Sequence, residues 1–395
     1  MNSANQTTPD RPAVGTGGGK PVVLQVLPEL VTGGVERGTV DIASAVADNG
    51  WVSIVASAGG PMVADLERAG VEHVTLPLQS KKPWTIHRNA GVLTELAFDR
   101  KVDIIHARSR APAWSAMIAA RRIGAHFVTT YHGAYNAANP IKNLYNSVMA
   151  RGERVIAISD FIAQQIQQRH KTESERIVTI HRGVDVDLFD PQKTSAERII
   201  QLANAWRLQD GMPVIMLPGR LTRWKGQSVL IDALGHLGRD DVRCLLVGSD
   251  QGRKGYRQEL DKLIRDRGLE HIIHVVDNCR DMPAAYMLAD VVVSASTDPE
   301  AFGRIAVEAQ AMGRPVVASD HGGARETVIP WQTGWLVKPD DPKALATAIA
   351  EALALDPAAR EKMADVARAH VLKQFTVAQM REATLGVYRQ VLGQA

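Results

Sequence analysis

The sequence predicts an α/β fold with two doubly wound parallel sheets, arranged as two domains in series that face a cleft. Continuous apolar runs, typical of parallel strands buried on both faces, alternate with helical stretches along most of the 395 residues. The alternation pauses once, near residues 185–195, and then begins again. The chain length also suits about two average domains.

The first series contains six candidate strands. We expect them at Val22–Leu27, Val52–Ala56, Val102–His106, Phe127–Tyr131, Val155–Ile158 and Ile177–Ile180, with helices at Glu36–Asp48 and Ala111–Arg122. Right-handed crossovers make such strands parallel, so residues 20–190 are predicted to form the first Rossmann-like domain. Residues 1–19 are polar and lack the apolar core of a signal peptide, which indicates a flexible tail on a cytoplasmic protein.

The second series follows a segment, 183–193, that is rich in aspartate and contains a proline. A helix is expected at Ser195–Arg207, and strands are expected at Val214–Leu217, Cys244–Val247, Ile272–Val276, Val291–Ser294 and Val316–Ser319. Residues 191–376 are therefore predicted to form the second Rossmann-like domain. The amphipathic stretch within residues 377–395 predicts a last helix that could pack on either domain, including back on the first.

Composition and missing motifs exclude several classes of protein. The net charge is only +3, so no nucleic-acid partner is expected, and two cysteines exclude a disulfide scaffold. No apolar run reaches the roughly 20 residues that span a bilayer. Neither G-x-G-x-x-G after the first strand, nor a P-loop, nor a G-x-S-x-G turn is present. Asp185 and Asp187 have a spacing that some metal sites use, but a turn or capping role is favoured.

The segment 298–309 carries the strongest chemical signal. Pro299 disfavours helix at the preceding residue, so a helix is predicted from about Phe302 to Gly313. Glu300 would lie just outside its N-terminus and Glu308 in its second turn. Free backbone N–H groups between these carboxylates favour an anion, so a ligand with a phosphate and hydroxyl groups on both sides, such as a nucleotide sugar, would fit.

A second anion-binding segment, Gly219–Gly226, follows the first strand of the second domain. Arg220 and Lys225 lie at its two ends and could converge on a diphosphate. Two cations and a helix N-terminus could neutralise a departing diphosphate without a metal ion, so neither a metal nor another cofactor is expected.

The combination resembles the family 4 retaining glycosyltransferases of the GT-B fold. The resemblance rests on the glycine turn at Gly33-Gly34, the G-R-x-x-x-x-K-G loop, the pair formed by Glu300 and Glu308, and Gly322-Gly323, and it covers nearly the whole chain after the tail. It implies a metal-independent hexosyltransferase that uses a GDP- or UDP-hexose and retains the anomeric configuration.

The resemblance also implies roles for single residues. Arg220 and Lys225 would bind the donor diphosphate, Glu308 the ribose, and Glu300 the transferred sugar. The implied contacts to the distal phosphate and the sugar come from Gly33, Gly34, Phe302, Gly303, Arg304 and His132. The implied catalytic set is His132, Glu300, Arg220 and Lys225. We could assign no carboxylate as a covalent nucleophile, which favours front-face substitution.

The acceptor side is expected in the first domain. Residues 81–151 contain eleven Lys and Arg against three Asp and Glu, with Trp84 beside Lys81 and Lys82. This surface could rest on an anionic inner-membrane face or take an anionic acceptor, with Arg108 and Arg110 as candidates. The run 107–116 and the run 130–136 look like a bacterial subgroup that builds lipopolysaccharide core, which implies a glycan or glycolipid acceptor.

Three alternatives stay open from the residues alone. A sugar-nucleotide epimerase or hydrolase would act on the donor without an acceptor. A non-catalytic sensor would bind the nucleotide and release none, and a phosphorylase-like protein would need a pyridoxal cofactor. Residues 277–280 could border the base, but they do not distinguish uracil from guanine.

Overall fold

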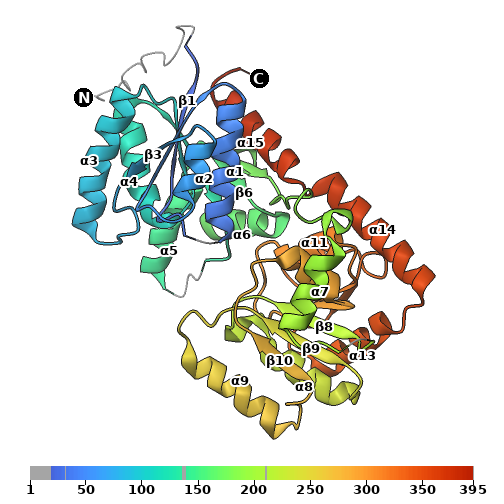
Figure 1. Cartoon of the computed structure of the whole chain (residues 1–395). Coiled ribbons are helices and arrows are strands. Elements are labelled where there is room, and N and C mark those ends of the chain that lie inside the picture. The colour runs from blue at the N-terminus through green and yellow to red at the C-terminus, as the bar shows by residue number, and fades with distance from the viewer. Residues whose placement is uncertain (1–18, 32, 136–138, 210, 395) are drawn as a thin grey trace, which may run out of the picture. The chain divides into compact units, whose positions relative to one another are not determined.

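The computed structural model describes residues 19–31, 33–135, 139–209 and 211–394. The described chain divides into two compact units (Figure 1). The first unit contains the residues up to Ile158, then Ile162–Ile180, and the residues from Arg381 onward; the second contains Ser159–Phe161 and His181–Met380. The predicted flexible tail, residues 1–19, lies outside the described residues except for Gly19.

The first unit has a sheet of seven parallel strands in the order β3-β2-β1-β4-β5-β6-β7. The strands are β1 (Val22–Val26), β2 (Val52–Ser57), β3 (Glu72–Thr75), β4 (Ile104–Ala107), β5 (His126–Tyr131), β6 (Arg154–Ala157) and β7 (Ile177–Thr179). The strand order reverses between β1 and β4. Ligands of doubly wound folds bind outside the carboxyl ends of the strands at such a reversal.

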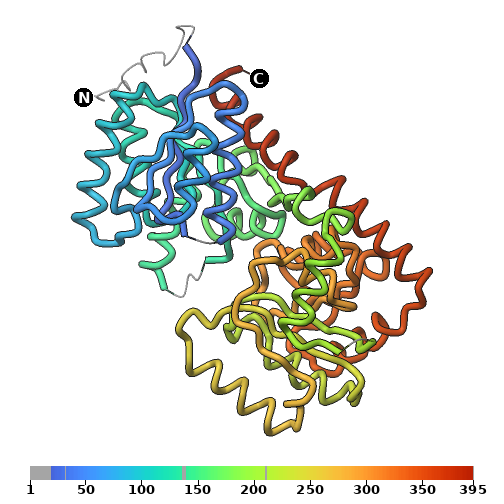
Figure 2. The backbone as a smooth tube through the Cα atoms, viewed as in Figure 1, coloured from blue at the N-terminus to red at the C-terminus, as the bar shows by residue number. Residues whose placement is uncertain are grey.

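Helices cover both faces of this sheet (Figure 1). They are α1 (Gly34–Asp48), α2 (Val63–Arg68), α3 (Pro83–Asp99), α4 (Arg110–Ile123), α5 (Pro140–Ser147), α6 (Asp160–His170) and α15 (Val377–Val391), with 3₁₀ turns η1 (Val148–Ala150) and η2 (Ser174–Arg176). From Arg381 onward the chain packs on α1, as Figure 2 shows. The Arg381 Nε donates to the Asp41 carbonyl at 3.0 Å, and its Nη2 donates to the Asp48 carboxylate at 2.8 Å.

The second unit has six parallel strands in the order β10-β9-β8-β11-β12-β13. They are β8 (Val214–Pro218), β9 (Arg243–Val247), β10 (Ile273–Val276), β11 (Val291–Ser294), β12 (Val316–Ser319) and β13 (Trp335–Val337). The helices are α7 (Ala196–Ala205), α8 (Gln227–Leu237), α9 (Lys254–Asp266), α10 (Met282–Leu288), α11 (Arg304–Ala311), α12 (Ala324–Thr327), α13 (Pro342–Leu353) and α14 (Pro357–Gln374), with 3₁₀ turns η3 (Pro191–Lys193) and η4 (Arg223–Lys225). The strand order reverses between β8 and β11.

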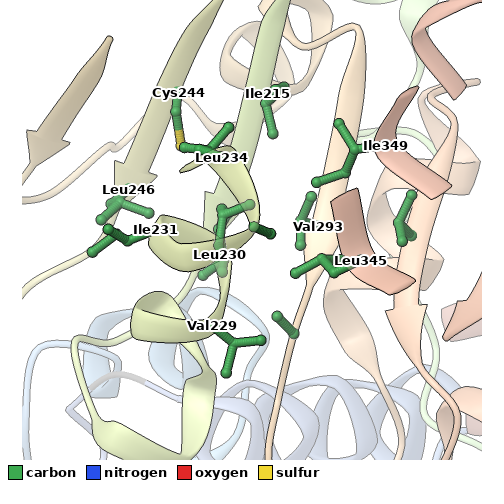
Figure 3. Close-up of a cluster of buried hydrophobic side chains, with 14 of the residues drawn as sticks. Ile215, Val229, Leu230, Ile231, Leu234, Cys244, Leu246, Val293, Leu345 and Ile349 are labelled. Carbon is green, nitrogen blue, oxygen red and sulfur yellow. The ribbon is translucent and has the colours of Figure 1, made fainter. Parts of the chain in front are cut away.

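A cluster of buried hydrophobic side chains packs α8 and α13 against this second sheet (Figure 3). Ile215 of β8 and Val293 of β11 lie within it, together with Leu230 of α8 and Ile349 of α13, and each is fully buried. Burial of such side chains fixes β8 and β11 side by side, so the loops that follow them leave the sheet from a rigid base.

The structure confirms two parallel sheets of alternating strands and helices and corrects some boundaries. The units separate at Ile180–His181, not at residue 190, because Val184 exchanges backbone hydrogen bonds with Phe375 and Val377 of the second unit (2.7 and 3.1 Å). Strands β3 and β13 were missed. Helix α11 begins at Arg304 rather than near Phe302, and the preceding Gly303 is left-handed (φ 86°).

No helix in the described part of the chain is both long enough and apolar enough to cross a membrane.

Candidate active site

In the second unit, the loops after β8 and β11 touch at the reversal of strand order. The Thr297 N–H donates to the Trp224 carbonyl at 2.8 Å. Gly226 is left-handed (φ 71°), and a Cβ there would stand 1.8 Å from the Ala295 carbonyl oxygen. Only glycine fits between the two loops at this point. The close approach brings together two segments that the sequence predicted as separate anion-binding elements.

Lys225 and Glu300 form a buried ion pair across these loops. The Lys225 Nζ lies 2.6 Å from the Glu300 Oε1, and the two side chains are only 11% and 13% exposed. The Ser296 hydroxyl donates to the same Oε1 at 2.6 Å. The Lys225 stem passes Gly219, whose φ is 144°, and its Nζ lies 4.5 Å from the centre of the Trp224 ring. The lysine that the sequence assigned to a diphosphate therefore faces the carboxylate assigned to a sugar.

The surroundings of Glu300 favour its charged form. Burial by itself would raise the pKa of this carboxyl group, but Lys225, the Ser296 hydroxyl and the nearby His321 together hold the pKa below its ordinary value. His321 is positioned by a contact of 2.8 Å between its Nε2 and the Ser296 carbonyl oxygen. Glu300 is therefore a fixed negative charge, suited to accept hydrogen bonds from hydroxyl groups.

Two glycines support the loop that carries Glu300. The Gly323 N–H donates to the Glu300 carbonyl at 2.8 Å. A Cβ on Gly322 (φ 58°) would stand 2.4 Å from that carbonyl oxygen, and a Cβ on Gly323 would stand 2.5 Å from the Phe302 Cα. The Gly322-Gly323 motif thus lets the chain after β12 pack directly against the backbone of residues 300–302.

Helix α11 positions Glu308 away from the first loop. The Glu308 Oε1 accepts from Arg304 Nε at 2.8 Å, and its Oε2 accepts from the buried Tyr286 hydroxyl at 2.9 Å. Glu308 is 8% exposed, whereas the Arg304 side chain is 45% exposed. Because α11 begins at Arg304, the N–H groups of its first turn come one or two residues later than predicted.

Arg220 is placed differently from Lys225. Residue Arg220 is exposed, and its carbonyl accepts from Gln227 Nε2 at 2.9 Å. Lys225 is turned toward Glu300, and a joint contact of Arg220 and Lys225 with a diphosphate stays a prediction. The Arg220 guanidinium forms no hydrogen bond or ion pair with the described residues.

The candidates of the first unit share one edge of its sheet. Gly33 and Gly34 begin α1 after β1, His132 directly follows β5, and Arg108 directly follows β4. His132 is half-buried. Arg110 stacks on Tyr135, with 4.0 Å between the guanidinium carbon and the ring centre. These strands are neighbours, so the sheet brings the candidate positions to its carboxyl edge.

His106, at the same edge, has a structural role. Its Nδ1 lies 2.5 Å from the Tyr388 hydroxyl and its Nε2 lies 2.7 Å from the Thr130 hydroxyl. Burial, and then the nearby Arg108, hold its pKa well below the ordinary value. A neutral histidine with both nitrogens bonded ties the end of α15 to the sheet.

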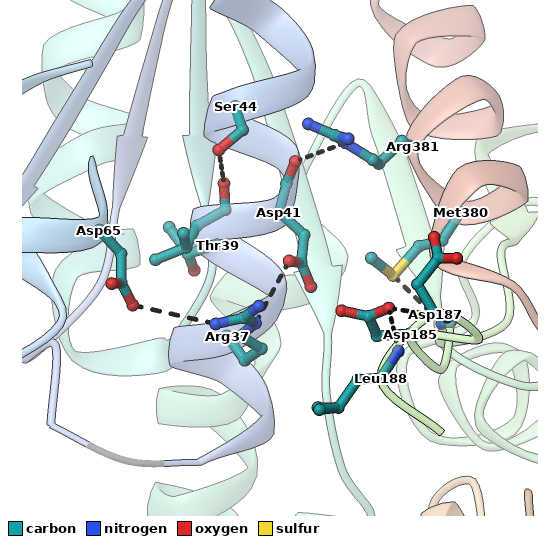
Figure 4. Close-up of polar contacts among 12 residues, drawn as sticks. Arg37, Thr39, Asp41, Ser44, Asp65, Asp185, Asp187, Leu188, Met380 and Arg381 are labelled. Carbon is teal, nitrogen blue, oxygen red and sulfur yellow. Dashed lines mark hydrogen bonds and ion pairs between the residues drawn. The ribbon is translucent and has the colours of Figure 1, made fainter. Parts of the chain in front are cut away.

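The Asp185-x-Asp187 pattern forms a turn, as the sequence favoured (Figure 4). The Asp185 Oδ1 accepts from the N–H groups of Asp187 and Leu188, both at 3.1 Å, and Asp187 pairs with Lys193 at 2.5 Å. Another group of possible metal ligands in the described chain is Asp160, His181 and Glu326. There, the Glu326 carboxylate already accepts the N–H groups of residues 160 and 161 (2.8 and 2.7 Å).

Three residues of the site were missed by the sequence analysis: Ser296, His321 and Tyr286. Ser296 and His321 follow the carboxyl ends of β11 and β12, which are adjacent strands, so a signal for them existed. Tyr286 sits on α10, and only packing shows that it meets Glu308.

Taken together, the second unit offers a fixed carboxylate, a lysine bound to it, an exposed arginine and a helix N-terminus at one sheet edge. This set of charges suits a ligand that is anionic in one part and hydroxylated in another.

Known protein families match both units. Residues 32–188 match the family described as Glycosyltransferase Family 4, and residues 199–370 match Glycosyl transferases group 1. A D-inositol 3-phosphate glycosyltransferase of Xylanimonas cellulosilytica is 30% identical over 412 aligned positions, covering 99% of this chain and 96% of that protein. The chain therefore belongs to the glycosyltransferase family that these two matches and this relative define.

Solved structures agree with this assignment. The crystal structure of a glycosyltransferase from Rickettsia africae has a TM-score of 0.88 and 37% identity, covering 95% of this chain and all of that one. The structure of Anabaena HepE in complex with UDP-glucose has a TM-score of 0.80 and 25% identity, covering 93% and 99% of the two chains. The expected GT-B architecture and glycosyltransferase class are confirmed.

Proposed function

We propose that this protein is a retaining, metal-independent hexosyltransferase that moves a hexose from a nucleoside diphosphate to a glycan or glycolipid acceptor. The observation that carries the proposal is the buried Lys225–Glu300 pair at the strand-order reversal of the second sheet. The resemblance to HepE, which was solved with UDP-glucose, favours a nucleotide-sugar donor and makes a UDP-hexose the first donor to test.

Donor binding would divide the work among the residues of the second unit. Arg220 and the N-terminus of α11 would take the diphosphate, and Glu308 would accept hydrogen bonds from the ribose. Lys225 would exchange its contact with Glu300 for a phosphate oxygen as the donor binds. Glu300 would then be free to accept hydrogen bonds from hydroxyl groups of the hexose.

The reaction would proceed on one face of the sugar. The bond between the anomeric carbon and the phosphate oxygen breaks, and the acceptor oxygen attacks from the same face. The released phosphate oxygen takes the acceptor proton, so charge and atoms balance without a protein base. Arg220, Lys225 and the helix N-terminus would stabilise the charge that develops on the diphosphate. The roles of Gly33, Gly34 and His132 in the first unit stay predictions from the sequence resemblance.

A donor screen tests this proposal directly. Thermal unfolding is measured with UDP, GDP and ADP, and then with the matching sugar nucleotides. A ligand at 100 times its Kd should stabilise the folded chain by about 2.7 kcal/mol. Turnover should continue in EDTA, and nuclear magnetic resonance of the product should show the donor's anomeric configuration. An inverted product, or turnover that EDTA abolishes, contradicts the respective part of the proposal.

Two classes of acceptor are candidates. A lipopolysaccharide-core acceptor stays a prediction from the sequence, and the D-inositol 3-phosphate glycosyltransferase relative suggests a phosphorylated polyol instead. Assays should therefore compare core oligosaccharide with D-inositol 3-phosphate. An epimerase or hydrolase would convert the donor equally fast without any acceptor, and a sensor would convert none.

We also propose that the first unit contacts an anionic membrane surface. Trp84 of α3 is 69% exposed, and Ile141 and Leu144 of α5 are 80% and 59% exposed. The start of α4 adjoins both helices, because Ser115 donates to the Ile86 carbonyl and Trp114 donates to the Tyr145 carbonyl. No Asp or Glu occurs within residues 73–94 or 104–152. Exposed apolar groups among cations suit an anionic lipid interface.

Vesicle sedimentation tests the membrane proposal. The protein should sediment with vesicles of anionic phospholipid, less with zwitterionic vesicles, and less in high salt. Trp84→Ser should weaken binding several-fold. Trp331→Ser is a matched control, because Trp331 is also 69% exposed but belongs to the second unit. Equal loss with both variants, or no preference for anionic lipid, contradicts the proposal.

A further inference from the structure

Arg108 is a buried cation at the strand-order reversal of the first sheet. It follows the last residue of β4, and its N–H donates to the carbonyl of Val26, the last residue of β1, at 2.9 Å. The residue is only 3% exposed. The guanidinium therefore sits where doubly wound folds bind their ligands, and it is almost wholly removed from solvent.

The guanidinium of Arg108 forms no hydrogen bond or ion pair with the residues that the structure describes, and its buried Nε has no partner among them. Burial lowers the pKa of Arg108 from its ordinary value to about 10, and the electrostatic effects of Tyr388 and Asp41 offset this only in part. Arg110, two residues later, is different: it donates to Asn146 at 2.9 Å and stacks on Tyr135. A buried charge without a partner is costly, and proteins seldom keep one without a use for it.

Helix α1 lies directly against this cation. The Arg108 Nη2 stands 3.0 Å from the point that a Cβ on Gly38 would occupy, so the glycine makes room for the guanidinium. The first intrahelical hydrogen bond of α1 runs from the Arg37 N–H to the Gly33 carbonyl (3.1 Å). The N–H groups ahead of Arg37 have no partner within the helix, and the helix dipole makes this end positive. The Glu36 carboxylate lies beside Gly33 at this end of the helix, so the buried guanidinium is the feature that would attract an anion.

We propose that Arg108 is the charged centre of an anion-binding site in the first unit, which takes a phosphate or carboxylate group of a bound substrate. This inference rests on the proposed function, since it names the chemistry of a substrate at that sheet edge. The anion is either a substituent of the acceptor or the distal phosphate of the donor. The anion would supply the partner that Arg108 lacks. The sequence alone gave no reason to choose between Arg108 and Arg110 as the residue that binds it.

The test uses the full chain and reads stability, so it does not depend on transfer. Arg108→Met removes the cation with little change of volume, and Arg122→Met, at the exposed end of α4, is the matched control. Without ligand, Arg108→Met should raise the Tm by about 2–4 °C and Arg122→Met should not. Inorganic phosphate, added at constant ionic strength, should raise the Tm of the wild type and the control more than that of Arg108→Met.

A second variant tests the proposal independently in case Arg108→Met does not fold. Gly38→Ala keeps the arginine but pushes on the guanidinium, so it should also weaken the response to phosphate. Arg108→Met that responds to phosphate as strongly as the control overturns the proposal.

Two probes identify the source of the anion. If the acceptor supplies it, D-inositol 3-phosphate should stabilise the wild type more than myo-inositol does, and Arg108→Met should remove that difference while binding UDP normally. If the donor supplies it, Arg108→Met should weaken binding of the sugar nucleotide at least tenfold. A variant that leaves both affinities unchanged contradicts the assignment to a substrate. If transfer is never observed but the phosphate response follows Arg108, the proposed function fails and the anion site stands.

Discussion

Replacing Lys225 by methionine tests whether the site is organised by its buried ion pair. The change keeps the length of the side chain and removes the charge that lies 2.6 Å from Glu300 Oε1. The carboxylate would then keep only the Ser296 hydroxyl as a direct side-chain donor, at 2.6 Å. Glu300 would remain buried, because its burial comes from the surrounding loops and not from the lysine alone.

The expected cost follows from distance and burial. At 2.6 Å and an effective dielectric constant of about 20, the attraction between the two charges is about 6 kcal/mol. Desolvation of both groups cancels much of this attraction. Breaking a buried pair from one side typically destabilises the fold by about 3–5 kcal/mol, and we expect Lys225→Met to fall in that range. Removing both charges, as in Lys225→Met with Glu300→Met, should restore most of the lost stability.

Urea unfolding at pH 7, followed by circular dichroism and fitted with one transition for each unit, measures the four proteins of this cycle. The coupling energy between the two changes should be about 2–4 kcal/mol in the second unit, with the first unit unaffected. Additive effects, with a coupling below about 0.5 kcal/mol, would refute the reasoning, because independent sites behave in that way.

Three further predictions concern the same unit. Gly323→Ala should lower transfer at least tenfold with the fold retained, because the added Cβ would stand 2.5 Å from the Phe302 Cα; a normal kcat/KM contradicts this. Glu308→Gln should weaken nucleotide binding about tenfold, measured by calorimetry, while the Tyr286 contact preserves the fold. The pKa of Glu300 lies below its ordinary 4.5, so its contribution to stability is complete above pH 4.5 and is lost as the pH falls through the lowered pKa. Glu300→Gln should therefore reduce the loss of stability that is measured on acidification.

The strands of the two sheets show how much of the fold the sequence predicts. Strands β11 and β12 were predicted with their observed bounds, because both are buried on two faces and read as uninterrupted apolar runs. Strand β3 was missed, since it is an edge strand with half-exposed residues and a Glu at its start. Strand β13 has only three residues and also lies at an edge. A pattern of apolar residues is weak where a strand has one neighbour and a solvated face.

The site shows the same division at the level of side chains. Glu300 and Lys225 could be predicted from loops that follow strands, and Glu308 from the helix that follows one of these loops, because parallel sheets gather such segments at one edge. The contact between Lys225 and Glu300 could not be predicted from the sequence. These residues are 75 positions apart, and the two loops meet only because Gly226 lets the backbones approach.

The sequence by itself determined the α/β class, the two sheets and the family, since these depend on periodicity and on short motifs that local chemistry dictates. Tertiary structure alone decided which charges are paired. It joined Lys225 to Glu300 and left Arg108 buried beside α1 with no ion-pair partner among the described residues. Electrostatic energy depends on distance and on exclusion of water, and both are fixed by packing between segments that the sequence holds far apart.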